Sequence, residues 1–144
     1  MTHIIIGSDH AGYYLKDQIV QYLKSNGTEV TDVGCYDTSS VDYPNVAEEL
    51  CARLKDATNT KGILCCGSGV GMAMAANRHP FIRAVRAHDV VSAKLSRMHN
   101  DANVLCFGAR MIAPALAYEL MNVWLSTSFE GDRHQRRIDQ MAKL

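Results

Sequence analysis

Short apolar runs alternate with helix-patterned segments along the whole chain, and this alternation limits the fold more than any other feature. The runs that we expect to form strands are His3–Ile6, Glu29–Val33, Gly62–Cys66, Arg83–Ala87 and Asn103–Phe107. After the first run, apolar residues recur at helical spacing, so that Leu15, Ile19 and Leu23 share one helix face. Strands that alternate with helices predict a parallel sheet with helices on both faces.

The predicted helices complete an α/β architecture. We expect helices after Gly12 up to Asn26-Gly27, from Val46 to Leu54, from Gly71 through Ala76, from His88-Asp89 through Met98, from Pro114 to about Leu125, and over Glu130–Leu144. A polar loop, Cys35–Asn45, separates the second strand from the second of these helices. The 144 residues, 47% of them hydrophobic, fit one domain over residues 1–144. The expected fold is a Rossmann-like three-layer sandwich with five parallel strands and a C-terminal helical arm.

The charge balance excludes several classes of partner. Fifteen basic and fifteen acidic residues cancel, which removes the simplest argument for binding nucleic acid or an anionic membrane. No stretch approaches the ~18 apolar residues of a spanning helix, and the apolar run at the amino terminus is too short for a secretory signal.

The cysteines indicate the redox compartment. Their number is odd, and they form no C-x-x-C pair and no cysteine–histidine spacing typical of zinc sites; they are Cys35, Cys51, Cys65, Cys66 and Cys106. We therefore expect free thiols in a soluble protein of a reducing compartment, the cytoplasm, with no metal site.

Polar residues gather where the predicted strands end. In a parallel sheet, ligands bind beyond the carboxyl ends of the strands. Those ends carry Asp9-His10, Cys66, His88-Asp89 and Gly108-Ala109-Arg110. This set combines acids, bases, a thiol and backbone donors, so we expect the functional site at this edge.

The loop Gly67-Ser68-Gly69-Val70-Gly71 joins a strand to a helix. Glycines there let backbone N–H groups converge, and the helix amino end adds positive potential, which favours an anion. The loop is not a P-loop, because no Gly-Lys-Ser/Thr follows. A dinucleotide fingerprint fits less well, since the third glycine comes one position early. The remaining alternative is a tight turn that binds nothing.

Cys66 is the last strand residue before this loop. A helix amino end lowers the pKa of a thiol, and the position predicts an accessible thiolate that serves as base or nucleophile. Its neighbour Cys65 should point to the opposite face of the sheet, because strand side chains alternate. The alternative for Cys66 is a small buried apolar residue.

Two further groups have both a functional and an ordinary interpretation. His99 precedes the fifth strand at a helix end, where it either acts as a general acid or base or is simply solvated. Arg133 and Arg137 are four residues apart and share a helix face, either as a pair that binds a phosphate dianion or as a solvated basic surface.

Seven segments together resemble the ribose/galactose isomerase family, in order from the first strand to the last helix. They are Gly7-Ser8-Asp9-His10-Ala11-Gly12, Asp42-Tyr43-Pro44, Gly67-Ser68-Gly69-Val70-Gly71, Ala75-Ala76-Asn77-Arg78, Ser96-Arg97-Met98-His99-Asn100-Asp101, Phe107-Gly108-Ala109-Arg110 and Arg133-His134-Gln135-Arg136-Arg137. The resemblance implies a cofactor-free and metal-free enzyme that interconverts ribose 5-phosphate and ribulose 5-phosphate through an enediolate.

The same resemblance implies the role of each site residue. Cys66 would be the base that moves a proton between C2 and C1, and His99 would open the furanose ring. Ser68 and the N–H groups of the loop would hold the enediolate oxygens. Asp9 would contact sugar hydroxyls or relay the ring-opening proton. The phosphate would be bound by His10, Arg110, Arg133 and Arg137, and the rest of the sugar site would include Tyr43, Gly67, Gly69, Val70, Gly71 and Asn100.

The resemblance also implies an assembly and leaves other substrates open. A second branch of the family has a glutamate base at the position of Met72, so Cys66 with Met72 resembles the cysteine branch. Family members are homodimers or dimers of dimers with shared sites, and the C-terminal helix would be the exchanged arm. The alternatives are an isomerase of a six-carbon phosphosugar (allose 6-phosphate or galactose 6-phosphate) and a phosphosugar-binding regulator without catalysis.

Overall fold

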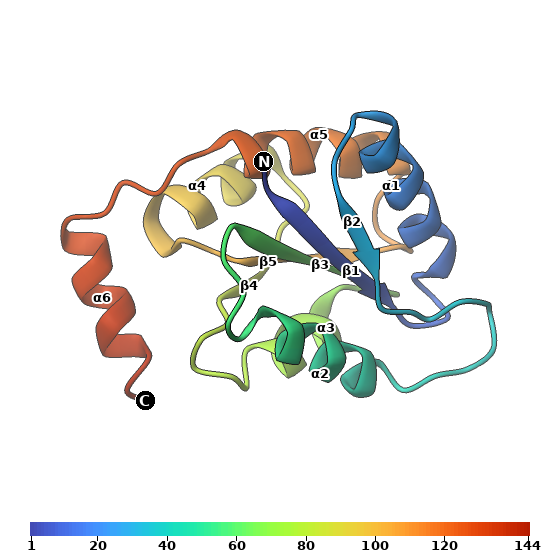
Figure 1. Ribbon diagram of the computed structural model, residues 1–144, viewed down its shortest axis with the longest axis horizontal. Helices are drawn as coiled ribbons and strands as arrows, with labels where there is room; N and C mark the ends of the chain where they lie inside the picture. Colours follow the sequence, from blue (N-terminus) through green and yellow to red (C-terminus); the bar gives the residue numbers. More distant parts are fainter.

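A single sheet of five parallel strands organises the chain, and the computed structural model describes residues 1–144. The strands are β1 (His3–Ser8), β2 (Val30–Asp32), β3 (Thr60–Cys66), β4 (Ala84–Arg86) and β5 (Val104–Gly108). They lie in the order β2-β1-β3-β5-β4 (Figure 1). The expected parallel sheet is confirmed, and β3, apolar on both faces, lies at its centre as a doubly covered strand should.

Six helices flank the sheet. They are α1 (Tyr13–Ser25), α2 (Tyr43–Leu54), α3 (Val70–Ala76), α4 (Val90–Asn100), α5 (Pro114–Ser126) and α6 (Arg133–Met141). Figure 1 shows α1, α4 and α5 on one face of the sheet and α2 and α3 on the other. The predicted three-layer arrangement is therefore confirmed. None of the six helices has the length and apolar content that crossing a membrane requires.

Two apolar clusters, one on each face of the sheet, form the core. The first includes Phe107 and Trp124 beneath α1 and α5, and the second includes Leu50 and Met72 beneath α2 and α3. The two adjacent thiols of β3 are divided between them, with Cys65 in the first cluster and Cys66 in the second. The predicted alternation of these two side chains is confirmed.

The boundaries of two helices differ most from the sequence prediction. The segment expected to be loop up to Asn45 already enters α2 at Tyr43, because Pro44 occupies the first turn, where a missing N–H costs nothing. The last helix was expected over Glu130–Leu144 but covers only Arg133–Met141. Gly131 and Asp132 have φ angles of +70° and +56°, outside the helical region, so the helix can begin only after them.

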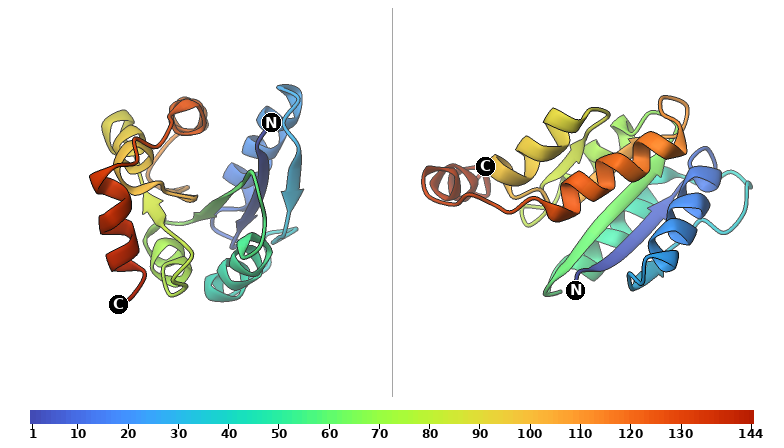
Figure 2. Two further views of the ribbon diagram at one scale, coloured as in Figure 1. Left: turned by 60° about the vertical axis from the view of Figure 1, so that its left-hand side comes forward. Right: turned by 90° about the horizontal axis from the view of Figure 1, so that it is seen from above.

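Helix α6 forms an arm at one end of the molecule. Figure 2 shows it beyond α4, at the outer end of the fold and away from the sheet. The segment that leads into it is tied to α4 by a hydrogen bond from the Glu130 N–H to the Met98 carbonyl oxygen, 3.1 Å. In Figure 1, α6 lies on the side opposite to the arrowhead of β1, that is, opposite to the carboxyl ends of the strands.

Candidate active site

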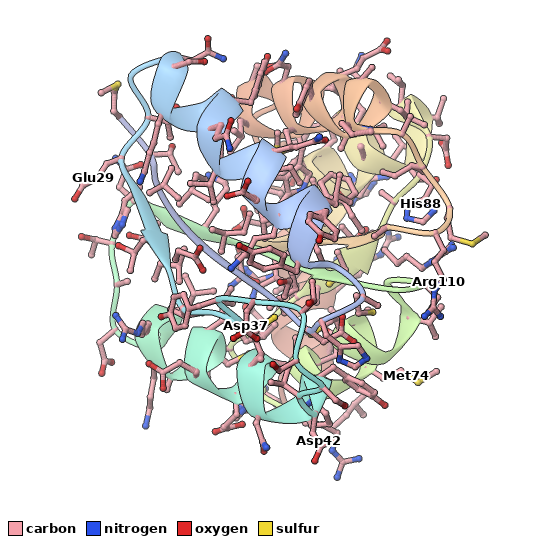
Figure 3. All side chains as sticks on the ribbon, turned by 90° about the vertical axis from the view of Figure 1, so that its right-hand side faces the viewer. Glu29, Asp37, Asp42, Met74, His88 and Arg110 are labelled. Atoms are coloured by element: carbon pink, nitrogen blue, oxygen red, sulfur yellow. The ribbon has the colours of Figure 1, made fainter.

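The carboxyl ends of the three central strands bring several of the predicted residues to one edge. Ser8 of β1 pairs with Cys65 of β3, and Cys66 pairs with Gly108 of β5. Asp9, which follows β1, is therefore a near neighbour of Cys66, and its N–H donates to the carbonyl oxygen of Cys65. Figure 3 looks onto this edge and shows Arg110 between His88 and Met74.

The thiol of Cys66 is held inside the loop that follows it. The N–H of Gly69 donates to its Sγ at 3.1 Å, a contact that stabilises negative charge on sulfur. The side chain is only 4% exposed, because the loop and α3 fold over it. The expectation of an accessible thiolate is therefore wrong for the single chain.

Cys65 has a different environment although it is the next residue. It is fully buried on the opposite face of the sheet. Burial raises the pKa of its thiol far above the usual range, and the neighbouring Cys66 adds to the effect. Cys65 therefore remains a neutral thiol at physiological pH and has no role as a base.

The loop between β3 and α3 has a defined conformation. Gly69 has φ +80°, a left-handed conformation that suits glycine, and it caps α3. Ser68 Oγ accepts the N–H of Val70 at 3.3 Å, and the Ser68 carbonyl oxygen accepts Arg86 Nε at 2.6 Å. The loop also packs tightly on β5, since a Cβ on Gly108 would lie 2.5 Å from the Ser68 backbone. These contacts fix the direction of the loop donors in advance of any ligand.

Asp9 and His10 are held by the turn after β1. Asp9 is 7% exposed, and its Oδ1 accepts the N–H of Gly12 at 3.0 Å. His10 Nδ1 accepts the N–H of Val41 at 3.2 Å, which leaves Nε2 as the protonated nitrogen of the neutral ring. His10 thus links the turn to the connection before α2.

Arg110 and Tyr43 border the glycine loop on two sides. A Cβ on Gly67 would lie 3.0 Å from Arg110 Nη1, so the guanidinium group lies directly over that residue. A Cβ on Gly71 would lie 2.7 Å from the Tyr43 ring, which therefore packs against the start of α3. A cation and an aromatic ring consequently line the loop near Cys66.

His88, at the end of β4, has a structural role. Its Nε2 accepts the N–H of Gly108 at 3.0 Å, which requires the neutral ring with an unprotonated Nε2. Burial and the nearby Arg86 lower the pKa of His88, in agreement with a neutral acceptor. The adjacent Asp89 caps α4 by accepting the N–H of Ser92 at 2.7 Å.

The other predicted site residues lie at the opposite end of the strands, where their amino ends lie. His99 and Asn100 end α4, which leads into the amino end of β5. Cys66 lies at its carboxyl end, and the five residues of β5 span about 13 Å at a rise of roughly 3.3 Å per residue. The carbonyl oxygen of Asn100 accepts Arg83 Nε at 2.9 Å, close to the start of β4. One chain therefore does not bring His99 to its own Cys66.

Arg133 and Arg137 lie on α6, the arm that packs beside α4. They therefore belong to the same half of the predicted set as His99 and Asn100, and not to the half with Cys66 and Arg110. A hollow of about 670 Å³ is also at this end. It lies between α6 and the segment from α3 to β4, and it includes Asn100 but none of the carboxyl-end residues.

Sequence reasoning missed a cluster of three potential ligands beside α6. The rings of His99 and His134 stack with centroids 4.4 Å apart and planes at 14°. Glu130 lies beside them, and one donor atom from each of the three side chains lies within 4.8 Å of the others. The spacing of four residues between Glu130 and His134 was visible, but only the packing of α6 on α4 adds His99.

Comparison with known proteins gives a consistent result along the full length. The family model described as Ribose/Galactose Isomerase matches residues 4–141. Ribose-5-phosphate isomerase B of Escherichia coli is 41% identical, with 100% of this chain and 97% of that protein covered. D-erythrulose-4-phosphate isomerase of Pectobacterium atrosepticum is also 41% identical, covering 98% of this chain and 93% of that one.

Solved structures agree with the sequence comparison. A ribose 5-phosphate isomerase from Thermotoga maritima superposes with a TM-score of 0.95 at 41% identity, covering 99% of both chains. Ribose-5-phosphate isomerase B from Mycoplasma genitalium, solved with bound ribulose-5-phosphate, superposes with a TM-score of 0.87 at 37% identity. This match covers 99% of the present chain and 95% of the other.

Proposed function

The chain belongs to the ribose/galactose isomerase family and is a sugar phosphate isomerase, and from this premise we propose that it interconverts ribose 5-phosphate and ribulose 5-phosphate. The proton moves between C2 and C1 through an enediolate, and no metal or cofactor takes part. Residues 1–144 act as one isomerase domain. The environment of Cys66 is the observation that carries the proposal. Its thiol accepts a hydrogen bond from a backbone N–H, and the residue ends a strand beside Asp9.

Cys66 is the base in this mechanism. The hydrogen bond from the Gly69 N–H stabilises the thiolate that removes the C2 proton and returns it to C1. Its low exposure keeps water away from the proton in transit. Cys65 cannot replace it, since that thiol points to the other face and stays protonated.

The glycine loop stabilises the enediolate. Negative charge develops on the sugar oxygens as the proton leaves, and N–H groups fixed in position beforehand stabilise that charge without reorganisation. The loop Gly67–Gly71 and the Ser68 hydroxyl supply these donors. Arg110, whose guanidinium group lies over Gly67, adds positive charge on the same side.

The active site is completed by a second copy of the chain. Cys66, Asp9, His10 and Arg110 lie at one edge of the sheet, whereas the ring-opening residue His99 lies at the other. In a two-fold dimer both subunits use the same surface patch, and residue i of one chain contacts residue j of the other. A patch that includes α4, α6 and the carboxyl ends of the strands can therefore place α4 and α6 of each chain on the strand ends of its partner. We expect a homodimer, or a dimer of such dimers, with two equivalent shared sites.

The donated half of the site would bind the closed sugar and its phosphate. His99 protonates the ring oxygen, because only the open aldehyde has an acidic C2 proton. Arg133 and Arg137, with His10 and Arg110 from the other copy, bind the phosphate dianion by charge-assisted hydrogen bonds. Asn100 contacts a sugar oxygen and Tyr43 lines the pocket beside the loop.

A shorter or longer phosphosugar is the second candidate. The relative from Pectobacterium atrosepticum is a D-erythrulose-4-phosphate isomerase at the same 41% identity as the Escherichia coli protein, which favours testing a four-carbon substrate. The family description also includes galactose. One carbon more or less changes only the depth of the pocket.

A substrate panel on the purified chain alone tests the proposal. Four-, five- and six-carbon aldose phosphates are compared by kcat/KM, and we expect the highest value for ribose 5-phosphate. A higher value for a four- or six-carbon sugar would replace the proposed substrate by that sugar. Binding of ribose 5-phosphate without turnover of any sugar would instead indicate a regulator that keeps the fold without catalysis.

A further inference from the structure

A buried histidine without a hydrogen-bond partner lies next to His99. His134 is 5% exposed, and its Nε2 is buried with no hydrogen-bond partner. A buried ring nitrogen normally has a partner, because an unpaired polar group away from water costs free energy. The nearest anionic atom is Glu130 Oε2 at 3.7 Å, which is too long for a hydrogen bond. His134 therefore points an unused nitrogen into the cluster.

The cluster has the donor set of a transition-metal site. One atom each from His99, Glu130 and His134 lies within 4.8 Å of the others. Two imidazole nitrogens and one carboxylate oxygen are a usual ligand set for Zn²⁺, with the fourth position open to water. We propose that these three side chains form a binding site for Zn²⁺ or a similar divalent transition metal.

Small side-chain movements suffice to close the site. Bond lengths of about 2.0–2.2 Å place tetrahedral Zn²⁺ ligands roughly 3.3–3.5 Å apart, so the three atoms must draw together by about an ångström. His134 is fixed by burial, but His99 is only half-buried and Glu130 is exposed. The ring of His99 turns out of its stack on His134, and the Glu130 carboxylate follows.

The ligand atoms and the charges around them set the affinity of the site. A histidine binds a metal through an unprotonated ring nitrogen, and the geometry offers the unpartnered Nε2 of His134. Glu130 contributes the single negative charge, whereas Arg133 and Arg137 oppose a cation. The site thus suits a reversible inhibitor ion rather than a permanently held structural metal.

A metal at this site would inhibit the isomerase. This consequence rests on the proposed function, in which His99 protonates the ring oxygen of the sugar. Coordination occupies a ring nitrogen of His99 and turns the ring away, so the ring-opening step is lost. The metal would therefore block closed sugars while leaving Cys66 untouched.

The test combines direct binding with inhibition. Binding is followed with Co²⁺, whose tetrahedral complexes with nitrogen and oxygen ligands absorb in the visible range, and inhibition with Zn²⁺ on ribose 5-phosphate. The variants are Glu130→Gln and His134→Gln. The matched control is His79→Gln, which breaks a histidine–glutamate pair with Glu48 (2.7 Å) outside the cluster.

In both cluster variants we expect Co²⁺ binding and Zn²⁺ inhibition to be at least about tenfold weaker than in the parent. The reason is that loss of an outer-sphere partner alone costs about 10–100-fold in metal affinity. The control should match the parent. Unchanged Co²⁺ binding in the cluster variants, or Zn²⁺ inhibition as strong as in the parent, would overturn the proposal. Because Co²⁺ binding needs no turnover, an inactive parent that binds Co²⁺ would refute the function and not the site.

Discussion

Mixing two inactive variants should restore activity if each site is built from two chains. In the proposed dimer, every site takes Cys66 from one copy and His99 from the other, since β5 separates these residues within a chain. Cys66→Ala and His99→Asn should each be nearly inactive alone. A mixed dimer, however, has one site with both lesions and one site with neither.

The size of the rescue follows from the same geometry. When equal amounts of the two variants associate at random, half of the dimers are mixed and half of the sites in those dimers are intact. The mixture should therefore regain about one quarter of the parental activity in a two-fold dimer. Co-expression of the two variants and measurement of kcat per site on ribose 5-phosphate provides the assay.

A second pair of variants serves as the control. In the proposed dimer His99 and Arg137 lie in the same half of the site, so co-expression of His99→Asn with Arg137→Ala leaves every mixed site with a lesion. The kcat/KM of this mixture should not exceed the mean of the two variants measured alone. Absence of rescue in the first pair would show that Cys66 and His99 do not meet across an interface. The active site would then not be shared between two chains, whatever the substrate.

Four further outcomes are expected. Cys66→Ala should lose kcat by several orders of magnitude and keep phosphosugar binding, whereas Cys65→Ala should change turnover little. An inactive Cys65→Ala beside an active Cys66→Ala would show that the roles of the two faces of β3 have been exchanged. Exhaustive chelation should leave activity unchanged or raise it; recovery that requires an added divalent ion would contradict the metal-free mechanism. Arg133→Ala and Arg137→Ala should each raise KM about thirtyfold, from the ~2 kcal/mol of a charge-assisted hydrogen bond, and near-parental kinetics would remove the phosphate assignment. Gly12→Ala should lower the free energy of unfolding, measured by urea titration, by about 1–3 kcal/mol. The Cβ of the alanine would lie 2.4 Å from the Cys65 carbonyl oxygen, and parental stability would show that the turn can relax.

The local pattern of the sequence predicted the elements well and their order across the sheet not at all. Alternation of apolar runs with helical stripes identified all five strands, and the continuous apolar run ending at Cys66 indicated a strand covered on both faces. The order β2-β1-β3-β5-β4 depends on which strands pair at long range. No spacing along the chain reports that pairing, so the edge positions of β2 and β4 required the structure.

The site residues show the same division between local and long-range information. Opposite directions for Cys65 and Cys66 follow from strand alternation and are confirmed. The burial of Cys66 depends on how the loop and α3 fold back over it, which composition does not report. The contact of His134 with His99 depends on the docking of α6 against α4. Roles assigned to the site residues remain predictions for the experiments above.

In the proposed dimer, helix α6 would serve catalysis without being part of the core that supports the sheet. Neither apolar cluster of the core includes a residue beyond Leu125, and Ile138, the buried apolar residue of α6, lies outside both. Proteolytic cleavage in the segment before Arg133 would leave both apolar clusters of each chain in place. Such a chain would keep its folded sheet, although it would have lost the arginines that it contributes to its neighbour in the proposed dimer.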